Sequence, residues 1–486
     1  MDTTDRSVGV GVPALIDELL SRIGERISGG RAEVVEAFAE AYTRRLHAEF
    51  ADLSLAELAG RVAGAFELAD GRGRAEATVR AFNPTPEQDG YETVGSVLQT
   101  NTEDSPFLFD SLSEELEERN LAVRRVIHPV VGTERGTDGR LVRVLHVREA
   151  ETRESVMHFE VDRRLDDEEL ADLEVAVEKI LGDVRLAVRD FGPMRQRVER
   201  MIELASAAAS GHEHEDVDET VAFLRWLLDM NFVFLGYGEF ALAERPSDAT
   251  LEIVEGTALG MLADSRWRSS GGPPPAQARR ASDRDATLGD PMTYSKTDRA
   301  STVHRRARMD SIGVPIVSAE GRLTGEARMV GLFTSKAYME PARRTPILRR
   351  KLTRILRSED LFEDSHDYKA VVSIFESFPK DELLAAPTEE LREQVMGLLA
   401  LQEQRHIRLF VRPDLRERSV SLLVVLPRDR FDAELRSRLQ KLFMERFKGS
   451  TVDYHLSLGE SQLAQLHFTV HVSTGHIPDV SFKALE

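Results

Sequence analysis

Residues 96–120 (SVLQTNTEDSPFLFDSLSEELEERN) change their hydrophobic period abruptly across a polar turn, and this change constrains the fold more than any other stretch. The run that ends near residue 98 is rich in β-favouring residues and breaks at the NTED tetrapeptide. Beyond the turn, leucines recur every four residues opposite a face of glutamates, at Leu108, Leu112 and Leu116. That spacing predicts an amphipathic helix over 105–119. The stretch therefore predicts a strand, an acidic turn and a helix.

The turn itself has the composition of a helix start. Asp104 or Ser105 is the expected N-cap, and Pro106 lies in the first turn, where its missing N–H costs nothing. Free backbone N–H groups in such a turn can hold the carboxylate of a small molecule, because the helix dipole adds partial positive charge there. A plain β-to-α connection with a good cap is the alternative interpretation.

The length of the chain and its composition limit the class of protein. At about 100–200 residues per domain, 486 residues predict about three domains. A hydrophobic fraction of 41% and a charged fraction of 30% are ordinary for a globular protein. The chain has no cysteine, which excludes disulfides, zinc–thiolate sites, iron–sulfur clusters and thiol nucleophiles. The net charge of −20 would repel a polyanion, so we expect no nucleic-acid partner.

Targeting features are also missing from the sequence. The first residues lack the basic region and apolar run of a secretory signal peptide. No segment reaches the roughly 18 uninterrupted apolar residues that a membrane-spanning helix requires. We therefore expect a cytoplasmic protein without a membrane partner.

The order of expected elements begins with a helical segment. Residues 1–92 comprise about three helices and a linker at 81–92 that is dense in Pro, Asn and Gly. From 93 to 190, the order of strand, helix, two or three antiparallel strands and helix predicts a ferredoxin-like layer, with one sheet covered by helices on one face. A helical linker is expected at 191–217.

Two further αβ domains are expected downstream. The second spans 218–345 and contains a mobile loop near 265–290, which is rich in Gly, Pro, Ser and Arg. A helical linker at 346–404 precedes the third domain at 405–486, whose ββαββ order stops in mid-pattern. The predicted fold class is therefore α+β, with three ferredoxin-like βαββαβ domains joined by helical linkers.

Two charged segments allow a functional and a structural interpretation. His212 and His214 could bind a metal, but histidines two apart on a helix point to different faces, so a solvated loop is favoured and no metal site is predicted. The basic helix PILRRKLTRILR at 346–357 could contact phosphates. In an acidic chain, pairing with a neighbouring acidic surface is favoured.

Catalytic and nucleotide-binding motifs are absent from the sequence. GVGVP at 9–13 has no preceding strand and no third glycine, and there is no P-loop, G-x-S-x-G or H-E-x-x-H. The histidines are scattered, and no spacing of carboxylates singles out a catalytic pair. We therefore predict no catalytic and no cofactor-binding residues, which favours a binding or regulatory role.

Several segments resemble the N-terminal half of the large bacterial NAD-dependent glutamate dehydrogenases. They keep the family's order over roughly residues 90–475. The segments are DSPFLFDSL (104–112), FLRWLLDMNFVFLGYGEF (223–240), KTDRASTVHRRARMDSIGV (296–314), GRLTGEARMVGLFTSKAY (321–338), PILRRKL (346–352), SHDYKAVVSIFESFPKDEL (365–383), VVLPRDRFDAELR (424–436) and LGESQLAQLHFTV (458–470).

The resemblance implies three ACT-type domains, at about 93–190, 218–345 and 405–486. ACT domains commonly bind amino acids near the turn after their first strand. Members of the family oxidise glutamate to 2-oxoglutarate and ammonia with NAD, respond to amino-acid or metabolite effectors, and form homo-oligomers, often tetramers. The resemblance therefore implies that the parent protein is an enzyme. Its NAD and catalytic residues would lie in a core that the sequence lacks, and that core and other subunits would be the partners of this region.

The leading hypothesis is a non-catalytic regulatory and oligomerisation region that senses an amino-acid effector. The expected effector-binding residues form the polar turn: Asn101, Thr102, Glu103, Asp104 and Ser105. The usual ACT turn has a glycine after its proline, whereas Phe107 follows Pro106 here, which narrows the pocket. A purely architectural module without a ligand is the alternative hypothesis. A third is enzymatic activity of the chain itself, for which we expect no turnover.

Overall fold

The computed structural model describes residues 17–18, 31–44, 53–208, 213–243, 250–268, 291–363, 365–401, 406–414, 418–458, 463–472, 477–478 and 480. These residues form two compact units. The first unit comprises residues up to Val188 together with Ser301–Arg306, and the second comprises Arg189–Ala300 and the residues from Ala307 onwards. Each unit is described by itself.

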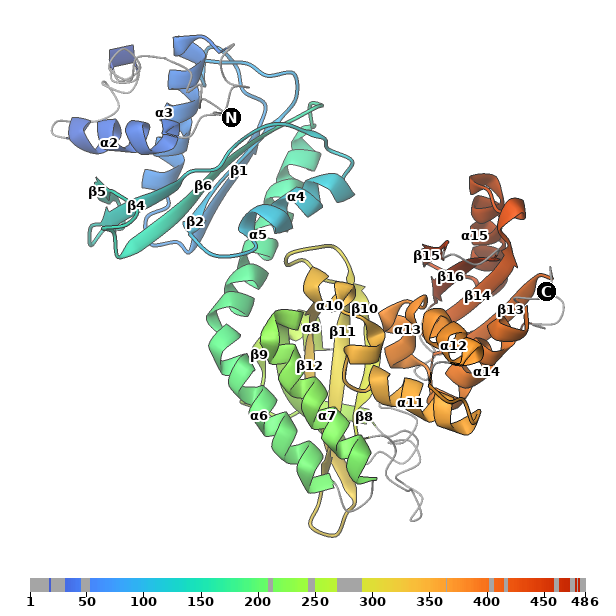
Figure 1. The fold of residues 1–486 in the computed structure, drawn as a ribbon. Coiled ribbons are helices and arrows are strands. Elements are labelled where there is room, and N and C mark those ends of the chain that lie inside the picture. The colour runs from blue at the N-terminus through green and yellow to red at the C-terminus, as the bar shows by residue number, and fades with distance from the viewer. Residues whose placement is uncertain are drawn as a thin grey trace, which may run out of the picture. The chain divides into compact units, whose positions relative to one another are not determined.

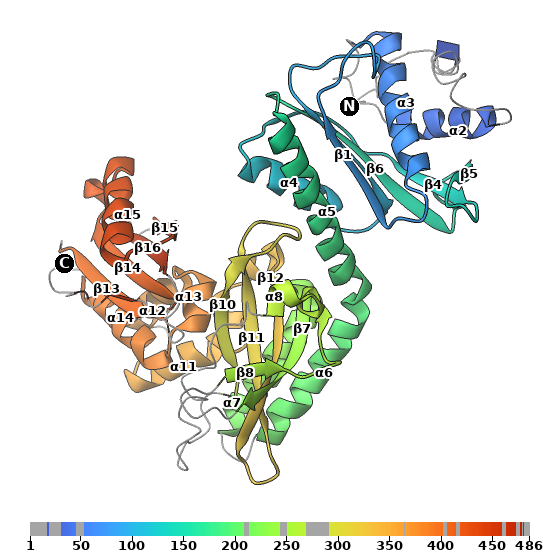
Figure 2. The same cartoon turned by 180° about the vertical axis from the view of Figure 1, so that it is seen from behind.

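The first unit contains one antiparallel sheet between two layers of helices (Figures 1 and 2). The strand order is β1-β2-β6-β4-β5, and β3 also pairs with β6. The helices are α2 (Ala32–Thr43), α3 (Leu55–Gly71), α4 (Leu108–Glu118) and α5 (Asp167–Arg189). The strands are β1 (Ala77–Phe82), β2 (Val97–Glu103), β3 (Val123–Ile127), β4 (Val130–Arg135), β5 (Leu141–Leu145) and β6 (Thr152–Val161).

Helices cover both faces of this sheet, so the predicted single helical face is wrong. The core beneath α2 and α3 joins Phe38 and Phe66 to Val156 of β6. On the opposite face, Phe109 of α4 stacks on Phe159 at a ring-centroid distance of 5.8 Å. Because successive side chains of a strand alternate between faces, the continuous burial of β6 from Glu154 to Val161 requires a cover on each side.

Strand β1 also corrects the sequence analysis. It starts within the segment expected to be helical and ends in the expected linker, and it pairs antiparallel with β2. The first sheet therefore begins at Ala77 rather than near Thr93. Helix α3, which precedes β1, starts with a capping box between Ser54 and Glu57. The first expected helix, around residues 15–23, lies almost entirely outside the described residues.

The second unit begins with helices packed on a meandering sheet of order β10-β11-β12-β7-β8, in which β9 pairs with β7. Met201 of α6 and Phe223 of α7 share a core with Ile312 and Met329. The helices are α6 (Phe191–Ala207), α7 (His214–Trp226) with the π-turn η3 (Leu227–Asn231), η4 (Met261–Ala263) and α8 (Ser265–Arg268). The strands are β7 (Phe232–Ala243), β8 (Thr250–Ile253), β9 (Leu259–Gly260), β10 (Thr293–Ala300), β11 (Arg308–Val317) and β12 (Leu323–Phe333).

This middle sheet does not have the βαββαβ order predicted for 218–345. Its covering helices α6 and α7 precede the first strand, and the described residues between β7 and β12 contain only short helical turns. The start of the expected mobile loop is helical, as α8, and residues 269–290 lie outside the described part of the chain.

A helical layer then leads into the third sheet, whose order is β13-β14-β16-β15. The helices of the layer are α10 (Ser335–Met339), η6 (Ala342–Arg344), α11 (Leu348–Ser358), α12 (His366–Glu376), α13 (Lys380–Ala385) and α14 (Thr388–Leu401). The strands of the third sheet are β13 (Arg408–Pro413), β14 (Ser419–Pro427), β15 (Thr451–Ser457) and β16 (Leu463–His471). The helices η7 (Arg428–Arg430) and α15 (Ala433–Phe447) lie between β14 and β15 in the chain.

The basic helix α11 pairs with acidic residues, as predicted. Arg350 bonds Glu213 at 2.8 Å and Asp216 at 2.5 Å, and it also contacts Glu215. Arg349 bonds Glu219 at 2.7 Å. His214 is the first residue of α7 beside this acidic group, and His212 lies outside the described residues.

The first and third sheets share one connectivity. In each, a helix leads to an edge strand, then to a central strand, a helix on one face, a third strand and a second central strand. The equivalent runs are α3-β1-β2-α4-β3-β6, in which the paired strands β4 and β5 are inserted between β3 and β6, and α14-β13-β14-α15-β15-β16. Relative to βαββαβ, the edge strand comes before the first central strand instead of last. The same arrangement therefore occurs twice in the chain.

Candidate functional site

The turn between β2 and α4 differs from the predicted helix start. Helix α4 begins at Leu108, and its N-cap residue is Phe107, which has left-handed dihedral angles of φ 74° and ψ −7°. No side chain caps the helix, so the expected N-cap at Asp104 or Ser105 is wrong. Pro106 disfavours a helical conformation at Ser105, so the chain enters the helix only after the proline. Phe107 therefore adopts a conformation that glycine normally supplies.

The structure separates the five expected effector-binding residues. Asn101 is fully buried, and its Nδ2 donates to Glu154 Oε2 at 3.0 Å. The Thr102 hydroxyl points from the opposite face of β2 and donates to the Glu76 carbonyl at 3.1 Å. Only the side chains of Glu103, Asp104 and Ser105 reach solvent. The five side chains therefore do not converge on one point, because strand alternation divides them.

Asp104 and His128 form the polar edge of this turn. Partial burial raises the pKa of Asp104, although its side chain reaches solvent, and the charges of His128 and Arg153 oppose the rise. The side chain of His128 also reaches solvent, and its partial desolvation lowers its pKa. Its Nε2 lies 2.8 Å from the Ser155 hydroxyl, and its ring stacks on Phe109. The edge therefore combines an acid and an imidazole whose charges attract.

A distant segment, Ser301–Arg306, covers the first turns of α4. The His304 N–H donates to the Ser111 hydroxyl at 2.9 Å, and the His304 ring lies 3.1 Å from Asp110 and 5.3 Å from the Phe107 ring centre. Arg306 pairs with Glu115. Sequence reasoning missed this contact because no local pattern links segments about 190 residues apart. The helix start is thus already contacted by the chain itself.

Behind the turn lies a buried ionic network centred on Glu154 of β6. Its carboxylate accepts from Arg72 at 2.8 Å, from Arg135 at 2.7 Å and from the Thr133 hydroxyl at 2.8 Å. Burial alone would raise the pKa of Glu154, but the hydrogen bonds and charges of both arginines outweigh it and lower the pKa. Asn101 belongs to this network and therefore connects the turn to the core.

A second buried network lies between α3 and the same sheet. Arg61 bonds Glu160 at 2.7 Å and stacks its guanidinium 4.1 Å above the Tyr91 ring. His158, fully buried, lies 3.3 Å from Glu160 and 3.0 Å from the Gln99 amide. Burial opposes ionisation of Glu160, but the bonds to His158 and Arg61 lower its pKa to about 2.

The third sheet has a comparable buried polar group on its α14 face. Glu382 of α13 accepts from Arg412 at 2.7 Å and from the Ser421 hydroxyl at 2.8 Å. His467 of β16 is buried against the Phe378 ring, and burial lowers its pKa to about 4. His158 and His467 thus occupy equivalent central strands and face the helical layer that precedes each sheet.

No group of three or more His, Asp or Glu side chains in the described ranges is arranged to hold a metal ion. None of the helices in those ranges is both long and apolar enough to cross a membrane.

Comparison with known families identifies these domains. Residues 38–177 match the glutamate dehydrogenase ACT1 domain, 345–404 match glutamate dehydrogenase helical motif 1, and 408–486 match the glutamate dehydrogenase ACT2 domain. This chain belongs to the glutamate dehydrogenase family. The ACT1 match covers the first sheet, and the ACT2 match covers the third, which are the two sheets with shared connectivity.

The glutamate dehydrogenase relatives are longer proteins. The chain is 32% identical to an NAD-specific glutamate dehydrogenase of Halomonas elongata over 97% of its length and 30% of the relative's. It is 28% identical to the enzyme of the same name from Pseudomonas aeruginosa, and 26% identical to that of Mycobacterium tuberculosis. Those matches cover 96% and 78% of this chain, and 29% and 22% of the relatives. The chain therefore spans about 30% of the length of the first two relatives.

Proposed function

We propose that this chain is the regulatory and assembly region of an NAD-dependent glutamate dehydrogenase, which converts glutamate to 2-oxoglutarate and ammonia. The observation that carries the proposal is the pair of sheets with one connectivity, matched to ACT1 and ACT2 domains. In this proposal NAD and the reacting groups belong to a catalytic core outside the chain. Its partners are that core and other copies of the subunit, in a homo-oligomer such as a tetramer. A cytoplasmic location stays a prediction from the sequence.

The proposed effector is an amino acid at the β2–α4 turn. Glu103, Asp104 and Ser105 are the predicted contact residues whose side chains reach solvent, and carboxylates there can hold an ammonium group. Asn101 and Thr102 then act indirectly, by anchoring the end of β2 to the Glu154 network and to the Glu76 carbonyl. The purely architectural role, in which the same sheets pair subunits without a ligand, is the alternative.

Titration calorimetry with a panel of amino acids tests the sensing role. We expect one amino acid to bind, and Asp104→Asn to weaken its binding about tenfold, because a charged hydrogen bond is lost. Glu117→Gln, at an exposed position of α4, is the matched control. If no amino acid releases heat, the architectural role is favoured.

A second experiment tests the relation to catalysis. NADH formation from glutamate and NAD, followed at 340 nm, should be absent for this chain and present for a longer protein that carries it. Light scattering then measures the molar mass of the chain in solution, which shows whether the chain forms oligomers. Turnover by the chain alone would contradict the proposal.

A further inference from the structure

Arg328, in the centre of the middle sheet, is buried in a space that glycines leave open. It lies on β12 between Gly313 of β11 and Gly238 of β7, which are its direct cross-strand partners. Its side chain is 1% exposed, and its guanidinium lies 4.6 Å from the centre of the Phe240 ring. Nη2 donates to Glu326 at 2.6 Å, whereas Nε has no hydrogen-bond partner among the residues that the structure describes.

The arrangement requires a glycine at position 313, and position 238 is tightly packed. A Cβ atom at Gly313 would overlap the Glu326 carboxylate, which could then not remain beside Arg328. A Cβ at Gly238 would approach the Phe240 ring to 3.3 Å and Ile253 to 3.1 Å, which is tighter than ordinary packing. The missing side chain at Gly313 therefore leaves the space that the carboxylate of this buried ion pair occupies.

A second buried arginine, Arg418, lies nearby at the start of β14. Its side chain belongs to a residue that is 5% exposed, and neither Nε nor Nη1 has a hydrogen-bond partner within the described part of the chain. Its backbone carbonyl accepts from the Val472 N–H at 2.9 Å, which fixes the residue to the third sheet. Two of the three guanidinium nitrogens of Arg418, Nε and Nη1, therefore have no acceptor within the described residues.

The charges around Arg418 show which groups share its site. Burial is the main cause that lowers the pKa of Arg418, and the neighbouring charges of Arg328 and Arg308 lower it further. Asp414 and Asp298 oppose this effect through their charge, but neither bonds Nε or Nη1. Arg308 is half-buried, with Nη1 donating to the carbonyls of Thr297 and Asp298. The carboxylates nearby moderate the field without satisfying the donors.

Buried donors without acceptors are rare in native proteins, because each one loses its hydrogen bonds to water and gains nothing in return. A guanidinium presents its donors in a planar fork that matches the two oxygens of a carboxylate or phosphate. A bound oxyanion would accept a hydrogen bond from a donor that now has no acceptor, and its negative charge would reduce the repulsion among the arginines.

We propose that Arg418 and Arg328, with Arg308 beside them, bind the carboxylate or phosphate group of a small anionic ligand between the middle and third sheets. This site is separate from the β2–α4 turn, and it does not depend on the proposed function. It holds for any role of the chain.

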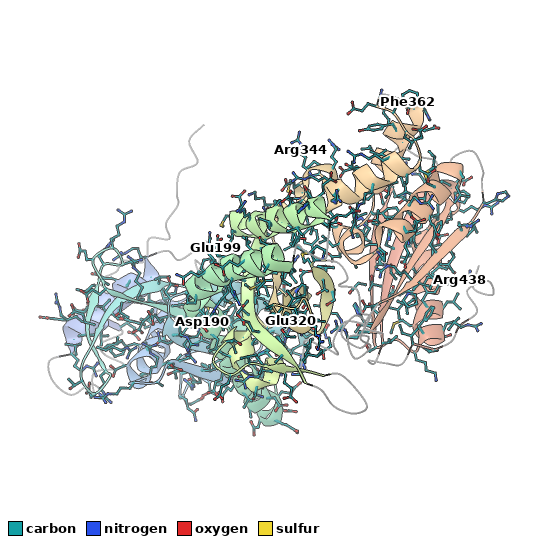
Figure 3. The ribbon with its side chains drawn as sticks, turned by 90° about the horizontal axis from the view of Figure 1, so that it is seen from below. Asp190, Glu199, Glu320, Arg344, Phe362 and Arg438 are labelled. Carbon is teal, nitrogen blue, oxygen red and sulfur yellow. The ribbon has the colours of Figure 1, made fainter. Side chains whose placement is uncertain are left out.

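The test uses the whole chain with inorganic phosphate and with succinate, each compared with sodium chloride at equal ionic strength. We expect one of these anions to raise the melting temperature and to bind in titration calorimetry, and the better of the two identifies the preferred oxyanion. Arg418→Gln and Arg328→Gln should each weaken that binding about tenfold or more. Arg438→Gln is the control, because Arg438 is exposed on α15 (Figure 3).

A further variant, Arg418→Met, keeps the test decisive if a glutamine variant fails to fold. Removal of a buried charge without partners should leave the anion-free melting temperature at or above that of the wild type, while the stabilisation by the anion disappears. The proposal is overturned if neither anion stabilises the wild type beyond chloride, if the glutamine variants bind as tightly as the wild type, or if Arg418→Met melts lower without anion.

Discussion

Phe107 and Ile347 hold the same position before the starts of two helices, although their ψ angles differ, at −7° and −50°. Each follows a proline, each has a positive φ, of 74° and 68°, and each immediately precedes the leucine that begins α4 or α11. The tetrapeptides are SPFL and TPIL. Large side chains rarely adopt positive φ, and a β-branched residue does so at particular cost. The surrounding packing must therefore hold both residues in place.

The strain at Phe107 can be measured by comparing glycine with alanine. Both substitutions remove the ring contact with His304, but only glycine relieves the left-handed backbone. We expect Phe107→Gly to have a free energy of unfolding about 1 kcal/mol higher than Phe107→Ala, and Ile347 to show the same order. Urea denaturation measures both pairs. The control is Glu117, which lies within α4, and there the alanine variant should be more stable than the glycine variant. If the alanine variant is also the more stable at Phe107, the backbone at Phe107 is not strained.

Acid should destabilise the first sheet through Glu160. Its pKa is about 2 in the folded chain and near 4.5 when unfolded, so its contribution is fully present above pH 4.5 and is lost as the pH falls towards 2. The shift corresponds to about 3 kcal/mol. We expect Glu160→Gln to lower the free energy of unfolding at pH 7 by about that amount and to flatten its dependence on acid pH.

Urea denaturation at pH 7, 4.5 and 3 provides the measurement for Glu160. Glu118→Gln, on the exposed side of α4, is the control. An unchanged pH profile in Glu160→Gln would show that the Arg61 pair does not stabilise the fold.

His467 should make the third sheet sensitive to a different pH range. Burial lowers its pKa to about 4, below the unfolded value near 6.5, so the folded state favours the neutral ring. Stability is therefore lost as the pH falls from 6.5 to 4, by about 3 kcal/mol. His467→Leu should remove this part of the pH dependence of stability. Hydrogen exchange of the β16 amides at pH 6.5 and at pH 4 measures the effect. His366→Gln, at a side chain that is 89% exposed, should change nothing.

The contact between Ser301–Arg306 and α4 should control proteolysis. Glu115→Ala removes the carboxylate that holds Arg306, so the segment should open more often. We expect trypsin to cleave after Arg305 or Arg306 about tenfold faster, because cleavage follows the open population. Mass spectrometry of timed digests gives the rates. Glu118→Ala is the control, and equal rates in wild type and Glu115→Ala would mean that the ion pair does not hold the segment.

Local patterns predicted most elements but not their arrangement. The period change at 96–120 correctly indicated β2 and α4, and the leucines on the latter are buried. The acidic partner of the basic helix α11 followed from charge alone. The N-cap was wrong because a proline-induced turn required Phe107 to take a conformation that its residue type disfavours. The βαββαβ order predicted for the middle sheet was wrong because strands in a meander and strands in a βαββαβ unit have the same local periodicity.

The sequence by itself determined that helices and antiparallel sheets are combined, the position of most of these elements, and the resemblance to the glutamate dehydrogenases. These depend on short-range periodicity and on the order of segments, whereas the number of ferredoxin-like domains does not. Only the tertiary structure decided that β1 lies at the sheet edge, that helices cover both faces, that residues 301–306 lie on α4, and that Arg328 and Arg418 are buried with donors unfilled. Each of these depends on contacts between residues far apart in the chain. Burial and hydrogen bonding are settled by such contacts, and no local pattern records them.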